Sequence, residues 1–453
     1  MSKNTISLDE ARRRRNAAKK QQDQDPTAPL DRLNETCALV IMGSGVRIVR
    51  HGTDAKGKSS VSFLTEAAFT TLFGNETVVL DKKPVKTGQA WLEWPGRRTF
   101  EGITFAPGQE TPGHYNLWRG FAVEPCEGDC SLFLDHLRVN VCAEDPVIYA
   151  WVVGWFAQMV QDPMTKPGTA LVLRGGMGAG KTIVGEVIGS LFPHHYRLVD
   201  SPRYVTGQFN AHMADCLFLQ VDEGVWAGDK TAEGRIKGLI TSSHQMVEQK
   251  GVEPVTLPNL VRLLITSNEG WVVPAGKEER RFCVLDMADH AKGNHEYFGE
   301  MLSQLENGGR GALLKHLLDY DYSQINLRQP PRTVALDDQK IRSMPSIERW
   351  WMGRLVDGAI TRDVECWPPS YSKRAMYDDY IKESDRIGER RRASEPEFWT
   401  RLRKIMPSLE EKRIRTANGE RERHILLPDL ETCRDAFRDL YGLAGDHWSR
   451  WSE

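Results

Sequence analysis

A glycine-rich loop stands between a short apolar run and an amphipathic helical pattern in residues 171–192, LVLRGGMGAGKTIVGEVIGSLF. Its glycines permit backbone conformations with positive φ and turn successive N–H groups toward one point, where an anion can sit. A helix that begins near Lys181 adds its N-terminal dipole at the same point. The segment carries the complete G-x-x-x-x-G-K-[ST] pattern, so we expect an α/β fold in which this loop follows a strand of a parallel sheet.

The chemistry expected of this loop is the binding of a nucleoside triphosphate. The Lys181 ammonium would reach the β- and γ-phosphates, and the Thr182 hydroxyl would bind Mg²⁺. The predicted cofactors are therefore ATP and Mg²⁺, although the motif does not say what hydrolysis drives. The predicted nucleotide-binding residues are Gly175, Gly176, Met177, Gly178, Ala179, Gly180, Lys181 and Thr182.

A second apolar run, residues 216–221 (CLFLQV), is typical of a strand buried on both faces of a parallel sheet. It is followed by Asp222 and Glu223. Carboxylates at the carboxyl end of such a strand face the phosphate loop. We therefore expect Asp222 to hold Mg²⁺ and Glu223 to polarise the attacking water as a general base.

A third predicted strand, residues 260–267 (LVRLLITS), is followed by Asn268, whose amide is expected to position the lytic water or sense the γ-phosphate. Further along, Arg280 and Arg281 precede another β-rich run. An arginine placed there can reach the nucleotide of a neighbouring subunit and neutralise charge in the transition state, which requires a ring. An ordinary pair of surface arginines is the alternative, and which of the two would be the finger is left open.

Alternating apolar residues flank Lys250 and Gly251, which predicts a hairpin with a basic tip between the second and third strands. With this insertion the chain resembles the superfamily 3 helicases, hexameric AAA+ motors of small DNA viruses, plasmids and phages. Residues 237–282 (KGLITSSHQMVEQKGVEPVTLPNLVRLLITSNEGWVVPAGKEERRF) look like the helicase half of phage and plasmid primase-helicases. The resemblance extends to residues 115–121 (YNLWRGF) and 307–351.

This resemblance implies a fold and a set of roles. The fold is a P-loop AAA+ parallel sheet core with an N-terminal α+β domain and a C-terminal winged-helix-like domain. The implied partners are single-stranded and fork DNA, five further copies in a homo-hexamer, and a separate primase or polymerase. The matched residues are Lys181 and Thr182 in the phosphate loop, Asp222 and Glu223 as the acidic pair, Asn268 as the sensor, Lys250 and Gly251 at the DNA-contacting hairpin tip, and Arg281 or Arg280 as the arginine finger.

Composition sets few limits on this interpretation. The 453 residues are 40% hydrophobic and 27% charged with a net charge of -2, which is ordinary for a globular protein of about three domains. No apolar stretch approaches the length of a membrane span and no signal peptide is indicated, so we expect a protein of the bacterial host cytosol without a membrane partner. Cys126, Cys130, Cys142 and His136 are irregularly spaced, and we expect neutral thiols rather than a zinc site.

Four segments are expected along the chain. Residues 1–31 form a basic tail that contacts DNA or a partner, or is merely solvated. Residues 32–160 form an N-terminal α+β or collar domain, which lacks the Asp-x-Asp or Asp-x-Glu pair of a primase site. Residues 161–345 form the ATPase motor, and residues 346–453 form a helical, winged-helix-like domain.

The last segment predicts helices followed by a hairpin. Ser394 to Glu397 is a capping-box start for a helix through Met406, and Asn418-Gly419 is a strong turn signal between two basic strands. This is the order of a winged helix. Residues 371–424 hold 15 Lys and Arg against 11 Asp and Glu, a net charge of +4, which favours nucleic acid, while binding of a protein partner stays open.

The leading functional hypothesis is a ring-forming ATPase that draws single-stranded DNA through a central channel and unwinds duplex in phage or plasmid-type replication. Its DNA contacts would be with backbone phosphates and therefore weaken with salt. The alternative is an ATP-gated initiator or loader ring that binds DNA and recruits a primase without processive unwinding. A metabolic P-loop kinase is disfavoured, because the hairpin, Asn268 and the double arginine have no role in it.

Overall fold

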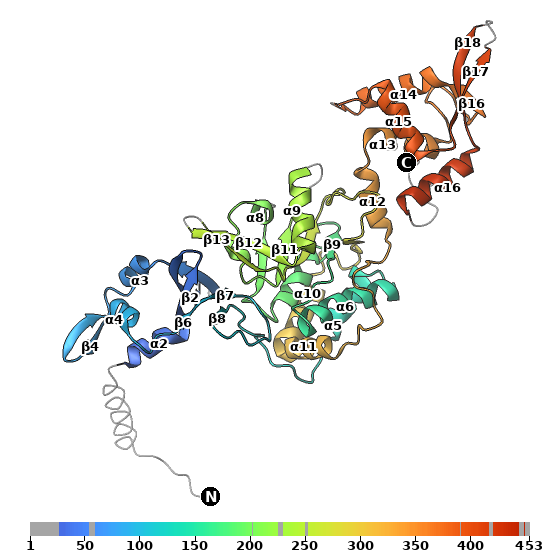
Figure 1. Ribbon diagram of the computed structural model, residues 1–453. Coiled ribbons are helices and arrows are strands. Elements are labelled where there is room, and N and C mark those ends of the chain that lie inside the picture. Colours follow the sequence, from blue (N-terminus) through green and yellow to red (C-terminus); the bar gives the residue numbers. More distant parts are fainter. Residues whose placement is uncertain are drawn as a thin grey trace, which may run out of the picture.

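The computed structural model describes residues 27–53, 59–201, 203–224, 230–249, 252–389, 391–415, 420–443 and 448. Figure 1 shows an N-terminal lobe, a central body and a C-terminal module arranged in a row, with helix α12 (Val334–Arg342) leading from the body to the module. The predicted basic tail lies almost entirely outside the described residues. Within the described part of the chain, every helix is too short or too polar to cross a membrane.

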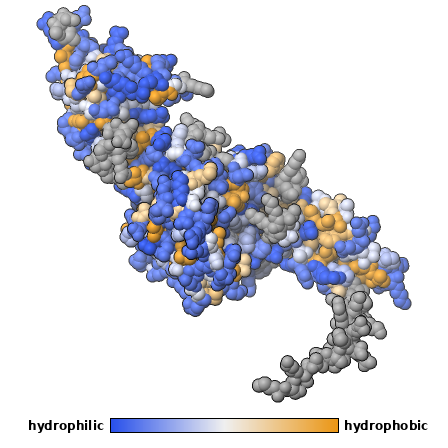
Figure 2. Space-filling view, turned by 180° about the vertical axis from the view of Figure 1, so that it is seen from behind, coloured by the Kyte–Doolittle hydropathy of each residue, from blue (hydrophilic) through white to orange (hydrophobic). Residues whose placement is uncertain are grey.

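The N-terminal lobe is built on a four-stranded sheet in the order β3-β2-β1-β6, in which only the β1–β6 pair is parallel. Strands β1 and β2 meet at a tight turn formed by Gly43 and Ser44. Apolar residues gather on the surface of this lobe (Figure 2), and Ile41, Leu72 and Val79 are among the exposed ones. The elements are α2 (Ala28–Thr36), β1 (Cys37–Met42), β2 (Gly45–Thr53), β3 (Ser59–Leu64), α3 (Glu66–Leu72), β4 (Thr77–Leu80), β5 (Lys83–Lys86), α4 (Thr87–Glu93), β6 (Thr99–Phe100), β7 (Gly102–Thr104) and β8 (His114–Asn116).

Five parallel strands form the sheet of the central body, in the order β10-β11-β14-β9-β15. The three predicted strands are confirmed as β9, β11 and β14, and all six residues of β14 are buried. Because β14 lies between β11 and β9, the segments that follow these three strands meet at one edge of the sheet. The strands are β9 (Ala170–Arg174), β10 (Tyr196–Val199), β11 (Phe218–Asp222), β14 (Arg262–Ser267) and β15 (Phe282–Asp286). A mixed α/β fold with a parallel sheet is therefore confirmed.

Helices cover both faces of this sheet (Figure 1). One face packs against α6, α7 and α11, and the other against α9 and α12. Helix α6 begins where Asp145 accepts hydrogen bonds from the backbone of the first turn, and it buries Trp151 and Trp155. The helices are α5 (Ser131–Asp135), the π-helical η1 (His136–Val141), α6 (Pro146–Gln161), α7 (Lys181–Gly189), α8 (Arg203–Thr206), the 3₁₀ turn η2 (Ala211–Met213), α9 (Lys230–Thr241), α10 (His295–Gln304), η3 (Leu305–Gly309) and α11 (Arg310–Asp319).

The C-terminal module has its own apolar core, which includes Trp351, Tyr380 and Phe398. The predicted capping box is present, since the Ser394 backbone N–H donates to Glu397 Oε2 at 3.0 Å. The predicted hairpin strands are also present, while their Asn418-Gly419 turn lies outside the described residues. The elements are α13 (Ser346–Asp357), β16 (Ser370–Ser372), α14 (Lys373–Arg386), α15 (Glu395–Ile405), β17 (Glu410–Arg415), β18 (Arg421–Leu426) and α16 (Leu430–Tyr441), with the sheet order β16-β18-β17.

Candidate active site

The glycine-rich loop connects β9 to α7 at the carboxyl edge of the central sheet. Gly178 and Gly180 adopt left-handed backbone, with φ of +79° and +90°. A Cβ added to Gly180 would lie 2.7 Å from His136 Cε1 and 2.7 Å from Phe298 Cε1. Both backbone conformation and space therefore require glycine at position 180, directly before the helix that carries Lys181 and Thr182.

The Lys181 ammonium is held inside the curve of this loop. It donates to the carbonyl oxygens of Gly175 and Gly176 and to Asn268 Oδ1, each at 2.8 Å. Burial lowers the pKa of Lys181, while the negative charges of Glu223 and Asp222 oppose that shift. An ammonium with these partners is already aimed at the space that the phosphates of a nucleotide would fill.

Asp222 is the last residue of β11, and hydroxyl groups from two other elements face it. Thr182 Oγ1 lies 3.4 Å from both carboxylate oxygens, and Thr266 Oγ1 of β14 donates to Oδ1 at 2.5 Å. A hydroxyl and a carboxylate beside a phosphate site are the few oxygen ligands that Mg²⁺ takes from protein when phosphates and water complete its shell. The donor set of Thr182 and Asp222 therefore fits this cation.

Glu223 occupies a strained turn directly after β11. Its backbone is left-handed, with φ of +53°, a conformation that non-glycine residues adopt at a cost and that clusters at functional sites. Its exposed carboxylate accepts a hydrogen bond from Asn268 Nδ2 at 2.5 Å. Asn268 thus links Lys181 to Glu223, because β14 lies between β9 and β11.

Two contributors were missed by sequence reasoning. Thr266 was visible only as a polar residue in an apolar strand, two positions before Asn268 and hence on the same face. No pattern in the sequence indicates that Lys292 belongs to the site. In the structure, a Cβ added to Gly176 would lie 2.6 Å from Lys292 Nζ, and Gly293 N donates to Gly178 O at 3.2 Å. The segment after β15 therefore folds back over the loop and adds a second ammonium there.

Arg280 and Arg281 lie at the opposite edge of the sheet from the loop. The Arg281 carbonyl oxygen accepts a hydrogen bond from Ala170 N at 2.7 Å. Ala170 is the first residue of β9, and the glycine-rich loop follows the last residue of the same strand. A five-residue strand separates the two edges by about 13 Å. Arg281 Nη1 lies 3.3 Å from the buried Glu279 carboxylate, and the Arg280 side chain is exposed. Neither arginine is beside the phosphate loop of its own chain.

The predicted hairpin is present as the antiparallel pair β12 (His244–Gln249) and β13 (Val252–Pro258), while its tip residues Lys250 and Gly251 lie outside the described residues. Asn210 braces β12, because its side chain donates to Met246 O and accepts from Glu248 N, both at 2.8 Å.

On the other strand of the hairpin, Glu253 accepts hydrogen bonds from Ser44 N at 2.7 Å and from Ser44 Oγ at 2.9 Å. We call this contact the Ser44–Glu253 latch. It ties the hairpin to the β1–β2 turn of the N-terminal lobe.

Known proteins resemble this chain in sequence and in fold. Residues 173–281 match a family of unknown function, DUF5906. Over 236 residues, 51% of this chain, the sequence is 23% identical to the DNA primase-polymerase of Nitratiruptor phage NrS-1, and the match covers 32% of that protein. The chain thus spans about a third of that relative's length. Two apo structures of the NrS-1 C-terminal region match with TM-scores of 0.60 and 0.62 at 15% identity, covering 89% of this chain and 100% of that region. The likeness to these structures establishes a shared fold.

Proposed function

We propose that the chain is the ATP-hydrolysing motor of a phage DNA replication protein and acts as a ring-forming helicase of the superfamily 3 AAA+ type. The observation that carries the proposal is the meeting of Lys181, Asp222, Glu223 and Asn268 at the phosphate loop. Similarity to a phage primase-polymerase over half of this chain supports the replication role. The proposal includes a separate primase or polymerase as a partner.

Each side chain has a task in hydrolysis. Lys181 would exchange two backbone carbonyls for oxygens of the β- and γ-phosphates. Glu223 would accept a proton from the attacking water, and Asn268 would orient that carboxylate through its amide. Mg²⁺, held by Thr182 and Asp222, would supply charge neutralisation at the phosphates. The Asn268 amide, which is hydrogen-bonded to both Lys181 and Glu223, would hold the two side chains in place before the nucleotide binds.

A ring explains the position of the arginines. Lys166, Arg280, Arg281 and Arg328 line one cavity of about 730 Å³ at the edge opposite the phosphate loop, and no carboxylate is among its described lining residues. Burial, with a smaller contribution from Arg262, lowers the pKa of Lys166 to about 7. Arg281 is held by Glu279, and the cations gathered in this cavity suit the γ-phosphate at a neighbouring subunit's loop, where they would neutralise transition-state charge.

Subunit mixing tests this proposal. Lys181→Ala alone should lower ATP turnover by roughly 10²-fold or more, because a cation is lost from the phosphates. Arg281→Ala should also be inactive yet bind ATP normally. Mixing these two variants should restore activity at composite interfaces, with co-assembly verified by native mass spectrometry and Arg280→Ala run in parallel. Near-normal ATP turnover by Lys181→Ala would refute the assignment of the ATPase site. If co-assembled subunits recover no ATP turnover, Arg281 does not act on the nucleotide of a neighbouring subunit.

The second candidate, an ATP-gated loader ring, shares this ATPase site. Strand displacement by the purified protein on a forked substrate separates the two, since only a translocating motor displaces the strand.

A further inference from the structure

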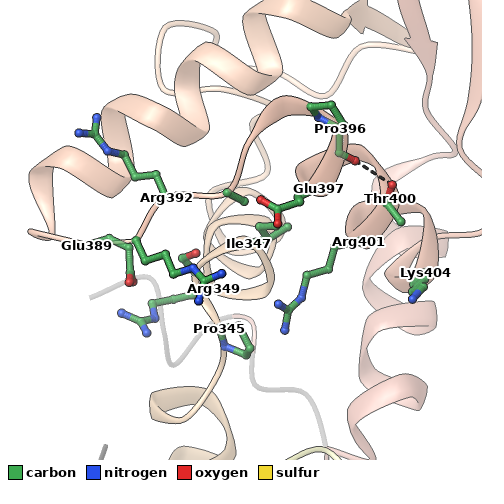
Figure 3. Close-up of a pocket in the computed structure, with 13 residues that line it drawn as sticks. Pro345, Ile347, Arg349, Glu389, Arg392, Pro396, Glu397, Thr400, Arg401 and Lys404 are labelled. Atoms are coloured by element: carbon green, nitrogen blue, oxygen red, sulfur yellow. Dashed lines mark hydrogen bonds between the residues drawn. The ribbon is translucent and has the colours of Figure 1, made fainter.

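The C-terminal module carries a groove of about 910 Å³ between the start of α13, the connection from α14 to α15, and the outer face of α15. Figure 3 shows the cationic side chains arranged around it, with Arg401 extending from α15 into the groove. Its charged lining residues are Arg349, Arg391, Arg392, Arg401 and Lys404 against Glu389 and Glu397.

Several of these charges already have partners. Glu397 serves the capping box of α15, and Arg392 lies 2.7 Å from Asp385. Arg401 Nε donates at 2.7 Å to Glu348, a buried carboxylate that fixes the direction of the guanidinium.

The remaining three cations, Arg349, Arg391 and Lys404, are exposed and form no ion pair with any described residue, and Arg349 Nη2 donates to the Met344 carbonyl oxygen at 2.9 Å. They come from α13, from the connection between α14 and α15, and from α15, so the fold, rather than one basic helix, brings these cations to a common surface.

The residues that line the groove favour a polyanion as its ligand over a protein surface or an unpaired nucleobase. None of the described lining residues is aromatic, so the groove offers no platform on which unpaired bases would stack. Ile347 is only 2% exposed and cannot serve as the apolar anchor on which protein interfaces depend. Spaced Lys and Arg side chains in an open groove match successive phosphates of a nucleic-acid backbone.

We propose that this groove binds the phosphate backbone of duplex DNA and so holds the unopened duplex beside the motor. The inference rests on the proposed function only in taking DNA as the partner, and it does not depend on ATP hydrolysis. Because the contacts are with phosphates, binding is independent of sequence.

The test compares two triple variants of the full chain. The groove variant is Arg349→Ala, Arg391→Ala, Lys404→Ala. The control variant is Arg374→Ala, Lys382→Ala, Arg438→Ala, which removes the same charge from surface positions outside the groove. Binding of a blunt-ended duplex is measured by fluorescence anisotropy without nucleotide across a salt series. The groove variant should bind roughly tenfold or more weakly and show a log–log salt slope flatter by about 2.7, while the control follows the parent.

Further measurements make each outcome decisive. A double variant, Arg349→Lys with Arg391→Lys, keeps all three positive charges and should keep the parental slope, whereas a general loss of structure on substitution at these positions would lower binding in this variant as well. Equal duplex binding by groove variant and parent overturns the proposal, as does a groove variant that loses only binding to polyglutamate, which would assign the groove to an acidic protein. Basal ATP turnover, measured on the same samples, reports separately on the proposed function.

Discussion

Protonation of His195 should destabilise the fold in mild acid. This imidazole is fully buried, and its two nitrogens have opposite roles. Nδ1 donates to Asp215 O at 2.8 Å, whereas Nε2 accepts from Arg119 N at 2.9 Å. Only the neutral ring can do both, and burial lowers the pKa of His195 to about 3. The ring also stacks on Trp118, with centroids 4.4 Å apart, so the charge cannot move to solvent without disrupting this packing.

The sign and size of the effect follow from the two protonation states. The unfolded chain binds the proton near pH 6.5 and the folded chain only near pH 3, so the stabilisation is present above pH 6.5 and is lost as the pH falls between these values. At pH 5 the solution is about 1.5 pH units below the unfolded pKa, and each unit is worth about 1.36 kcal/mol. His195 should therefore remove about 2 kcal/mol from the free energy of unfolding at pH 5.

The assay is denaturant unfolding at pH 7 and pH 5 of the parent, His195→Gln and His114→Gln. Glutamine can donate to Asp215 and accept from Arg119 but does not titrate, and His114 is an exposed control. His51 and His136 are also buried, with pKa values lowered to about 4, so the parent loses further stability from them. The informative quantity is the difference: the pH-dependent loss should be about 2 kcal/mol smaller in His195→Gln alone. Equal losses in all three proteins would refute the reasoning.

Three further changes separate the roles of the site, the hairpin and the scaffold. Glu223→Gln should bind ATP yet hydrolyse it at least 10²-fold more slowly, because the base is lost while Asp222 remains; loss of nucleotide binding would assign Glu223 another role. Lys250→Ala should keep basal ATP turnover but lose its stimulation by single-stranded DNA, together with unwinding, and parental unwinding would favour the loader. Arg262→Met should lower the free energy of unfolding by about 3 kcal/mol, since the buried guanidinium donates five hydrogen bonds, and an unchanged melting temperature would contradict this.

Local signals in the sequence predicted those parts of the molecule that depend on neighbouring residues. The phosphate loop, the strands beside it and the Ser394 capping box each lie within a short stretch, so spacing and residue type suffice to find them. The Ser44–Glu253 latch joins residues 209 positions apart, and Lys292 reaches the loop only through the path taken after β15. Arg262 is a single charged residue in the apolar run of residues 260–267, and nothing in that run indicates that its side chain binds the segment that links α6 to β9. Such contacts are set by tertiary structure and leave no periodicity to read.

The latch also has a mechanical consequence. Gly43 has φ of +59°, and a Cβ there would lie 2.3 Å from Glu253 Oε2, so the β1–β2 turn and strand β13 fit together without slack. A tilt of the hairpin strands must either break both Ser44 hydrogen bonds or rotate the N-terminal lobe with them. The stiffness of the hairpin strands therefore depends on the N-terminal lobe as well as on the central body. In the proposed motor, the distance that the hairpin moves would therefore depend on the β1–β2 turn, which lies in the N-terminal lobe and away from the glycine-rich loop between β9 and α7.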